Sequence, residues 1–102
     1  MTTPGTPPIG TLREWGNAFR DEIANLMEKQ LEGTGMAVHK EVYKDTPYGK
    51  RYIDVEIRDS QGKPIGGIET KLGNARYDPD QRRKDEWLLE NQKYKVNVAR
   101  SW

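Results

Sequence analysis

The feature of this sequence that most constrains its fold is a pair of strand-like segments joined by a short, turn-rich connector. Residues 52–57 alternate apolar and polar side chains, which is the pattern of a half-buried β-strand. Residues 64–72 form a second strand-like segment, and the connector at 59–64 contains the Asp, Ser, Gly and Pro residues that favour hairpin turns. We therefore expect the two segments to pair as a hairpin.

Two carboxylates and an amine lie on this predicted hairpin. Glu69 and Lys71 are two residues apart, so their side chains point to the same face of a strand, and strand pairing brings Asp54 near them. Converging charges of this kind are unfavourable unless another charge compensates them. A divalent cation with oxygen ligands would do so, and Mg²⁺ or Mn²⁺ suits an all-oxygen site better than zinc does. The other interpretation is an exposed sheet face with a cross-strand Lys–Glu pair.

The composition excludes several other kinds of site. The chain has 102 residues, of which 33% are hydrophobic and 32% charged, which is enough for one domain with a modest core. It contains no cysteine and one histidine, which excludes a disulfide scaffold and argues against a Ser–His–Asp hydrolase. No apolar run is long enough to span a membrane. The net charge of +1 permits a nucleic-acid partner without requiring one.

The N-terminal part of the chain is predicted to be a linker followed by a helix. Residues 1–10 are rich in Thr, Pro and Gly and read as a linker, which leaves residues 11–102 as a single domain. Thr11 is expected to cap a helix over residues 12–31, with Glu14 in a capping box. The apolar residues of this helix form one stripe: Leu12, Trp15, Phe19, Ile23, Leu26 and Met27.

The remaining segments complete an α/β fold. Residues 36–44 are predicted to form the first strand. Asp78 is expected to cap a second helix over residues 79–91, with Gln81 closing a capping box, and a last strand follows around 94–98. A strand–helix–strand crossover places the third and last strands in parallel, so the sheet is a mixed four-stranded sheet flanked by helices.

This αβββαβ order, together with Asp54 and the run Glu69-Thr70-Lys71, resembles the PD-(D/E)XK, or restriction-endonuclease-like, nuclease superfamily. The residue before Asp54 is Ile53 instead of the proline of the motif. The resemblance implies a minimal restriction-endonuclease-like core and metal-dependent hydrolysis of phosphodiester bonds. It implies that Asp54 and Glu69 bind the metal and that Lys71 acts in catalysis.

A narrower resemblance involves Tyr52-Ile53-Asp54-Val55, Glu69-Thr70-Lys71, Tyr77, Gln81 and Asp85. This set is similar to the small nuclease domains at the C-termini of polymorphic bacterial toxins, including those of contact-dependent inhibition and type VI secretion. The resemblance implies a delivered effector that cleaves DNA or tRNA in the cytoplasm of a target bacterium. It also implies a cognate immunity protein.

Three residues have both a catalytic and a structural interpretation. Glu22 interrupts the apolar stripe of the first helix, and a first-helix glutamate often joins the metal site of this superfamily; otherwise it reaches water at the edge of the stripe. Gln81 is expected to contact the site as well as to cap its helix. Glu56 lies on the same face as Asp54 and could reach the metal, but it is expected to face solvent or to form a structural pair.

Basic residues interleaved with tyrosines form the predicted nucleic-acid-binding surface: Arg76, Tyr77, Arg82, Arg83 and Lys84 around the second helix, and Lys50 and Arg51 near the first loop, close to Tyr48. A solvated, non-binding face is the alternative for such charge runs. A non-catalytic nucleic-acid-binding module with a nuclease-like fold is the alternative for the whole domain. The presence of Asp54, Glu69 and Lys71 together favours the enzyme.

Overall fold

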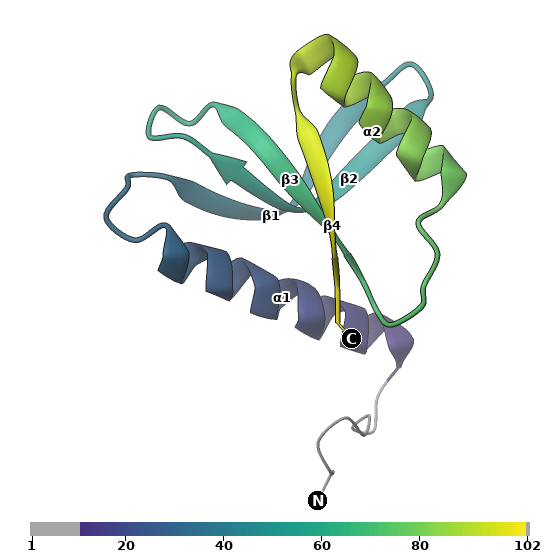
Figure 1. Cartoon of the computed structure of the whole chain (residues 1–102), viewed down its shortest axis with the longest axis horizontal. Helices are drawn as coiled ribbons and strands as arrows, with labels where there is room; N and C mark the ends of the chain where they lie inside the picture. The colour runs from purple at the N-terminus through teal and green to yellow at the C-terminus, as the bar shows by residue number, and fades with distance from the viewer. Residues whose placement is uncertain (1–10, 102) are drawn as a thin grey trace, which may run out of the picture.

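The computed structural model of the chain describes residues 11–101, so the predicted linker at 1–10 lies outside the described residues. The chain forms the predicted order of elements (Figure 1): α1 (Leu12–Gln30), β1 (Ala37–Thr46), β2 (Gly49–Arg58), β3 (Pro64–Lys71), α2 (Pro79–Gln92) and β4 (Lys95–Arg100). The predicted αβββαβ fold is therefore confirmed.

The four strands form one mixed sheet in the order β1-β2-β3-β4. β1 pairs with β2, and β2 with β3, in antiparallel fashion, while β3 and β4 are parallel because α2 forms the crossover between them. In the view of Figure 1, α1 lies below the strands and α2 above them. Neither of these described helices has the length and apolar composition needed to cross a membrane.

The helix starts agree only in part with the predicted caps. The Oγ1 atom of Thr11 accepts a hydrogen bond from the Glu14 backbone amide at 3.1 Å, as predicted. Asp78 also caps its helix, but its side chain accepts from the backbone amide of Asp80 at 2.7 Å and not from that of Gln81. The predicted Asp78–Gln81 capping box is therefore wrong, because the Gln81 side chain is bonded elsewhere.

The apolar stripe of α1 is only partly covered by the strands. Ala24 is the buried residue of α1, whereas Leu12 and Leu26 are 82% and 50% exposed. Arg20, one turn before Ala24, bonds to Glu41 of β1, so this polar face is turned toward the sheet. The predicted stripe is wrong at these two leucines.

A small core lies between α2 and the sheet. Ile53, Leu88 and Tyr94 are at most 2% exposed, and the partly buried residues packed against them are Val42, Trp87 and Val96. Glu56 is also fully buried, and its carboxylate lies 2.6 Å from Lys44 Nζ and 2.7 Å from Arg58 Nε. Glu56 therefore forms a structural pair and does not face solvent.

Gly67 is expected to be intolerant of a side chain. A Cβ atom at this position would lie 2.6 Å from Ile53 Cγ2 and 2.6 Å from Tyr94 Oη, both part of the small core. Gly67→Ala should therefore lower the free energy of unfolding by roughly 1–3 kcal/mol in urea denaturation. Gly16→Ala is the control, because a Cβ there meets nothing within 4 Å in a helix interior, and it should stabilise by about 0.5–1 kcal/mol. Equal effects of the two substitutions would contradict this packing.

Candidate active site

The candidate site lies where β2 and β3 separate. Their antiparallel pairing ends at Val55↔Ile68, after which β2 stays paired with β1 and β3 with β4. Asp54 and Glu69 are the first residues beyond this last pair, one on each arm. We call this divergence the fork. The fork places two carboxylates from different strands side by side. In a continuous ladder, the same two residues would be held in register on a flat surface.

Asp54 is held in place by β3. Its Oδ2 atom accepts hydrogen bonds from the backbone amide of Thr70 at 2.8 Å and from Thr70 Oγ1 at 3.0 Å. On the other side of β2, the residue between the paired Lys40 and Val42 is Glu41, which has a positive φ of 55°. A non-glycine residue in this conformation costs about 1–2 kcal/mol, so β1 is distorted directly beside Asp54.

Glu69 is the buried member of the carboxylate pair. It is 3% exposed, with Oε2 3.2 Å from Lys71 Nζ and Oε1 3.4 Å from Arg51 Nη2. Oε1 accepts no hydrogen bond from the described residues. Burial, followed by the neighbouring Asp54, raises the pKa of Glu69 to about 7, against the opposing effect of Arg51 and Lys71. Glu69 therefore gains or loses its proton near neutral pH, beside a second carboxylate.

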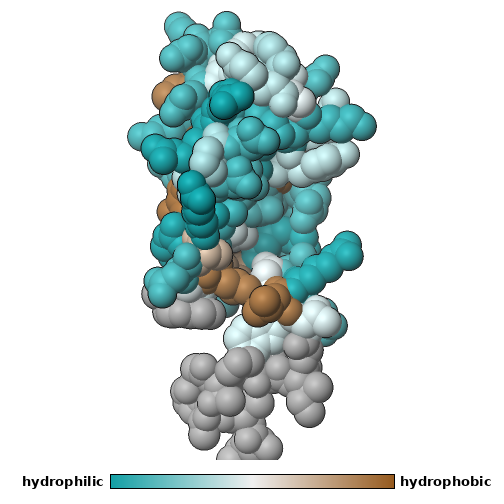
Figure 2. Space-filling view, turned by 90° about the vertical axis from the view of Figure 1, so that its right-hand side faces the viewer, coloured by the Kyte–Doolittle hydropathy of each residue, from teal (hydrophilic) through white to brown (hydrophobic). Residues whose placement is uncertain are grey.

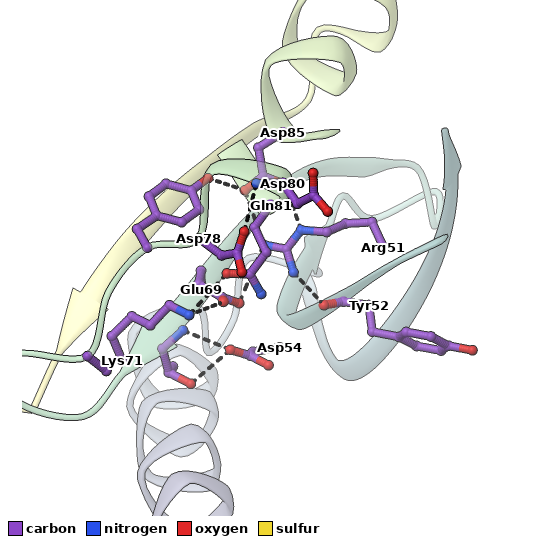
Figure 3. A network of polar contacts seen from close by, with 12 residues as sticks. Arg51, Tyr52, Asp54, Glu69, Lys71, Asp78, Asp80, Gln81 and Asp85 are labelled. Carbon is purple, nitrogen blue, oxygen red and sulfur yellow. Dashed lines mark hydrogen bonds and ion pairs between the residues drawn. The ribbon is translucent and has the colours of Figure 1, made fainter. Parts of the chain in front are cut away.

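Lys71 links this carboxylate to the start of α2. Its ammonium donates a hydrogen bond to Gln81 Oε1 at 3.0 Å while it pairs with Glu69, so its orientation is set from both sides (Figure 3). The structure thus brings together four of the predicted site residues: Asp54, Glu69, Lys71 and Gln81. The contact with Lys71 also explains why the Gln81 side chain does not close the capping box.

Arg51 is placed differently from the prediction. It was expected on the nucleic-acid-binding surface, but it is 3% exposed and bonds Asp85 of α2 through Nε at 2.8 Å and Nη2 at 3.1 Å. Tyr77, expected on the same surface, is half-buried and donates its hydroxyl to Asp85. Burial and the neighbouring Asp85 raise the pKa of that hydroxyl well above its usual range. Strand alternation was the missed signal, because Arg51 shares a face with Ile53.

Glu22 is not brought to the fork. It is exposed on α1, and no group of three or more Asp, Glu, His or Cys side chains within residues 11–101 is arranged to hold a metal. Two carboxylates nevertheless fit Mg²⁺, which commonly takes one or two of them and completes its shell with water and phosphate oxygens. The all-oxygen donors and the unbonded Glu69 Oε1 are consistent with such an ion.

The remaining predicted nucleic-acid-binding residues lie on the surface. Lys84 Nζ donates to the Lys50 backbone carbonyl at 3.0 Å, and the Arg83 guanidinium lies 5.5 Å from the Tyr48 ring, so the two predicted patches join at the β1–β2 turn. We call Lys50, Arg82, Arg83 and Lys84 the basic surface; Arg76 is exposed in the loop before α2. Figure 2 looks at the right-hand side of Figure 1, and this side of the molecule is mostly hydrophilic.

Comparison with known proteins supports the fold. The sequence matches no family model and no curated protein. Its structure is similar to part of a chain in a cryo-electron microscopy structure of a DrdV–DNA complex, with a TM-score of 0.55 and 22% sequence identity. The similarity covers 80% of this chain and 8% of that chain. At this level of identity the similarity shows a shared fold.

The raised pKa of Glu69 predicts an unusual dependence of stability on pH. Because the pKa of Glu69 is raised from 4.5 to about 7 in the folded state, its contribution is fully present below pH 4.5 and is lost as the pH rises through about 7. The slope for one proton is at most about 1.4 kcal/mol per pH unit. Asp54→Asn removes the second cause of the shift and should make the loss between pH 4.5 and 7 smaller in urea titrations. Asp45→Asn, which removes an exposed carboxylate outside the fork, serves as the control; identical pH profiles for the two variants would contradict the coupling.

Proposed function

We propose that this chain is a metal-dependent PD-(D/E)XK endonuclease that hydrolyses phosphodiester bonds of DNA or tRNA. The observation that carries the proposal is the fork, where Asp54 and the buried Glu69 meet with Lys71 beside them. A purely structural ion pair would not require a second carboxylate next to Glu69. Sites with perturbed carboxylates and convergent cations are typical of catalysis.

Each residue of the fork has a distinct role in this proposal. Asp54 and Glu69 would hold Mg²⁺ or Mn²⁺, which polarises the scissile phosphate and lowers the pKa of the attacking water when bound. Lys71 donates hydrogen bonds toward the negative charge that develops on the phosphate. Gln81 positions Lys71 through the 3.0 Å hydrogen bond. Arg51, buried behind Glu69, limits the charge repulsion between the carboxylates.

Two observations support a nucleic-acid substrate. The basic surface supplies four exposed or half-exposed cations that can contact phosphates without reading sequence. The structural similarity to part of a DrdV–DNA complex favours DNA over tRNA. Both observations are equally compatible with the alternative, a non-catalytic binding module. Such a module would bind nucleic acid as the enzyme does but would not cleave it.

The enzyme should cleave plasmid DNA or total tRNA in Mg²⁺ or Mn²⁺ and lose this activity in EDTA. Asp54→Asn, Glu69→Gln and Lys71→Ala should each lower cleavage at least 100-fold, since each removes a ligand or donor that acts on the transition state. Glu22→Gln is expected to cleave as the wild type does, because Glu22 is exposed and lies outside the fork.

A second measurement is independent of turnover. Excess Mg²⁺ should raise the melting temperature of the wild type more at pH 8 than at pH 6, because the ion competes with the proton on Glu69. Asp54→Asn should abolish most of this increase. Cleavage that persists after exhaustive chelation would refute the metal-dependent mechanism, and binding without any cleavage would favour the non-catalytic module.

We further propose that the domain is a delivered toxin with a cognate immunity protein. The support is the resemblance of Asp54, the run Glu69-Thr70-Lys71, Tyr77, Gln81 and Asp85 to the pattern of polymorphic toxin domains, together with the exposed basic surface, which an acidic partner would complement. Such a partner would cover the basic surface or fill the fork, and association should be fast and sensitive to salt.

Expression of the domain in bacteria should arrest growth if it is a toxin. The Asp54→Asn variant should be harmless, because it lacks cleavage while keeping its surface. Co-expression of the small open reading frame that neighbours the gene should restore growth, and its product should co-purify with the domain. If the domain cleaves nucleic acid in vitro but its expression is harmless, the nuclease proposal stands and the toxin proposal is contradicted.

A further inference from the structure

A row of exposed side chains runs along β2 from the β1–β2 turn to the fork. Lys50 is exposed, Tyr52 is 53% exposed and Asp54 is half-buried, while the intervening Arg51 and Ile53 are at most 3% exposed. Alternate residues of a strand share a face and are about 7 Å apart. The row therefore places a cation, an aromatic ring and a candidate metal ligand at regular intervals on one face.

A second tyrosine widens the middle of this row. Tyr43 of β1 is the direct cross-strand partner of Tyr52, their ring centroids are 5.5 Å apart with a 60° angle between the planes, and Tyr43 is 46% exposed. We call these two residues the tyrosine pair. The backbone under it is held firmly, because the Tyr52 carbonyl accepts a hydrogen bond from Arg51 Nη1 at 2.8 Å. In Figure 3 the Tyr52 ring extends away from the buried network, and 53% of the residue is exposed to a ligand.

We propose that the tyrosine pair stacks on one unpaired base of the substrate, next to the phosphate that is cleaved at the fork. The inference rests on the proposed function for the position of the phosphate. The charges on either side favour a nucleotide as the occupant. Lys50 on one side suits a backbone phosphate, and Asp54 on the other side belongs to the site that receives the cleaved phosphate. Aromatic side chains stack on any base, but only on a base that presents its face.

The inference narrows the class of substrate. A base inside a duplex is already stacked on both sides, so the tyrosine pair selects a nucleotide that is single-stranded, looped or displaced from its helix. Single-stranded DNA and the loops of structured RNA share this chemistry. The pair is thus a specificity-determining surface, distinct from the basic surface, which contacts phosphates of any conformation.

The test is a set of equilibrium binding measurements in EDTA, by fluorescence anisotropy, with labelled single strands of DNA and RNA and the matching DNA duplex. Tyr52→Ala should weaken single-strand binding about tenfold, as expected for one base–aromatic stack, and duplex binding less than about twofold. Tyr52→Phe, which keeps the ring, should stay within about twofold of the wild type. Tyr43→Ala should show the same preference for single strands with a smaller loss.

A base-deletion series identifies stacking directly. An abasic nucleotide moved along the single strand should weaken wild-type binding at one position and have no effect there with Tyr52→Ala, because the stack is already lost. The control variant is Ile65→Ala, which removes a 43%-exposed strand side chain outside the row and should bind as the wild type does. Melting temperatures verify that all variants are folded.

The outcomes separate this inference from the proposed function. Tyrosine-dependent binding of single strands by a protein that cleaves nothing in Mg²⁺ would support the stacking surface and overturn the nuclease. Cleavage with unchanged single-strand affinity in both alanine variants would overturn the stacking surface alone. An equal loss of single-strand and duplex binding in Tyr52→Ala would overturn it as well, since it would indicate a general effect on the surface.

Discussion

The structure depends on one buried ionic contact, the bidentate pair between Arg51 of β2 and Asp85 of α2. Few apolar side chains hold α2 to the sheet, with Ile53, Leu88 and Tyr94 at their centre. Breaking a buried pair by removing one partner commonly costs about 3–5 kcal/mol, because the other charge stays buried and unpaired. The Arg51–Asp85 contact therefore sets where α2 docks, and with it the position of Gln81 at the fork.

The same arginine explains the electrostatics of the candidate site. Three carboxylates, on Asp54, Glu69 and Asp85, are accompanied by two cations, on Arg51 and Lys71. The cluster is one positive charge short when all of its groups are ionised, and burial prevents water from making up the difference. The raised pKa of Glu69 is the consequence, and a divalent cation would remove the deficit and leave a net positive site for a phosphate.

The sequence was sufficient for the order of elements because each of them has a local signal. Thr11 and Asp78 cap helices, and alternation identifies the central strands, so the fold class and the proximity of Asp54 to Glu69 follow. The fork itself has no local signal, because it arises where two strands change partners. The prediction that Arg51 lies on the surface is wrong because it rests on the rule that charged residues are usually exposed. The Gln81 side chain contacts Lys71 instead of the helix cap, and this choice depends on tertiary contacts that the local sequence does not contain. Leu26 is exposed since α1 docks through Ala24 and the polar Arg20.

The two faces of β2 have different roles in this arrangement. Arg51 and Ile53 on the covered face carry ion pairing and core packing, so substitutions there change stability and the geometry of the fork together. Lys50 and Tyr52 on the other face are exposed and make no contribution to the core, so they can be replaced without loss of the fold. The alternation of a single strand thus separates the residues that hold the fold and the fork from the residues that are free to vary on the surface. In a chain with 33% hydrophobic residues, this separation matters more than in a larger domain, because the small core leaves little stability in reserve.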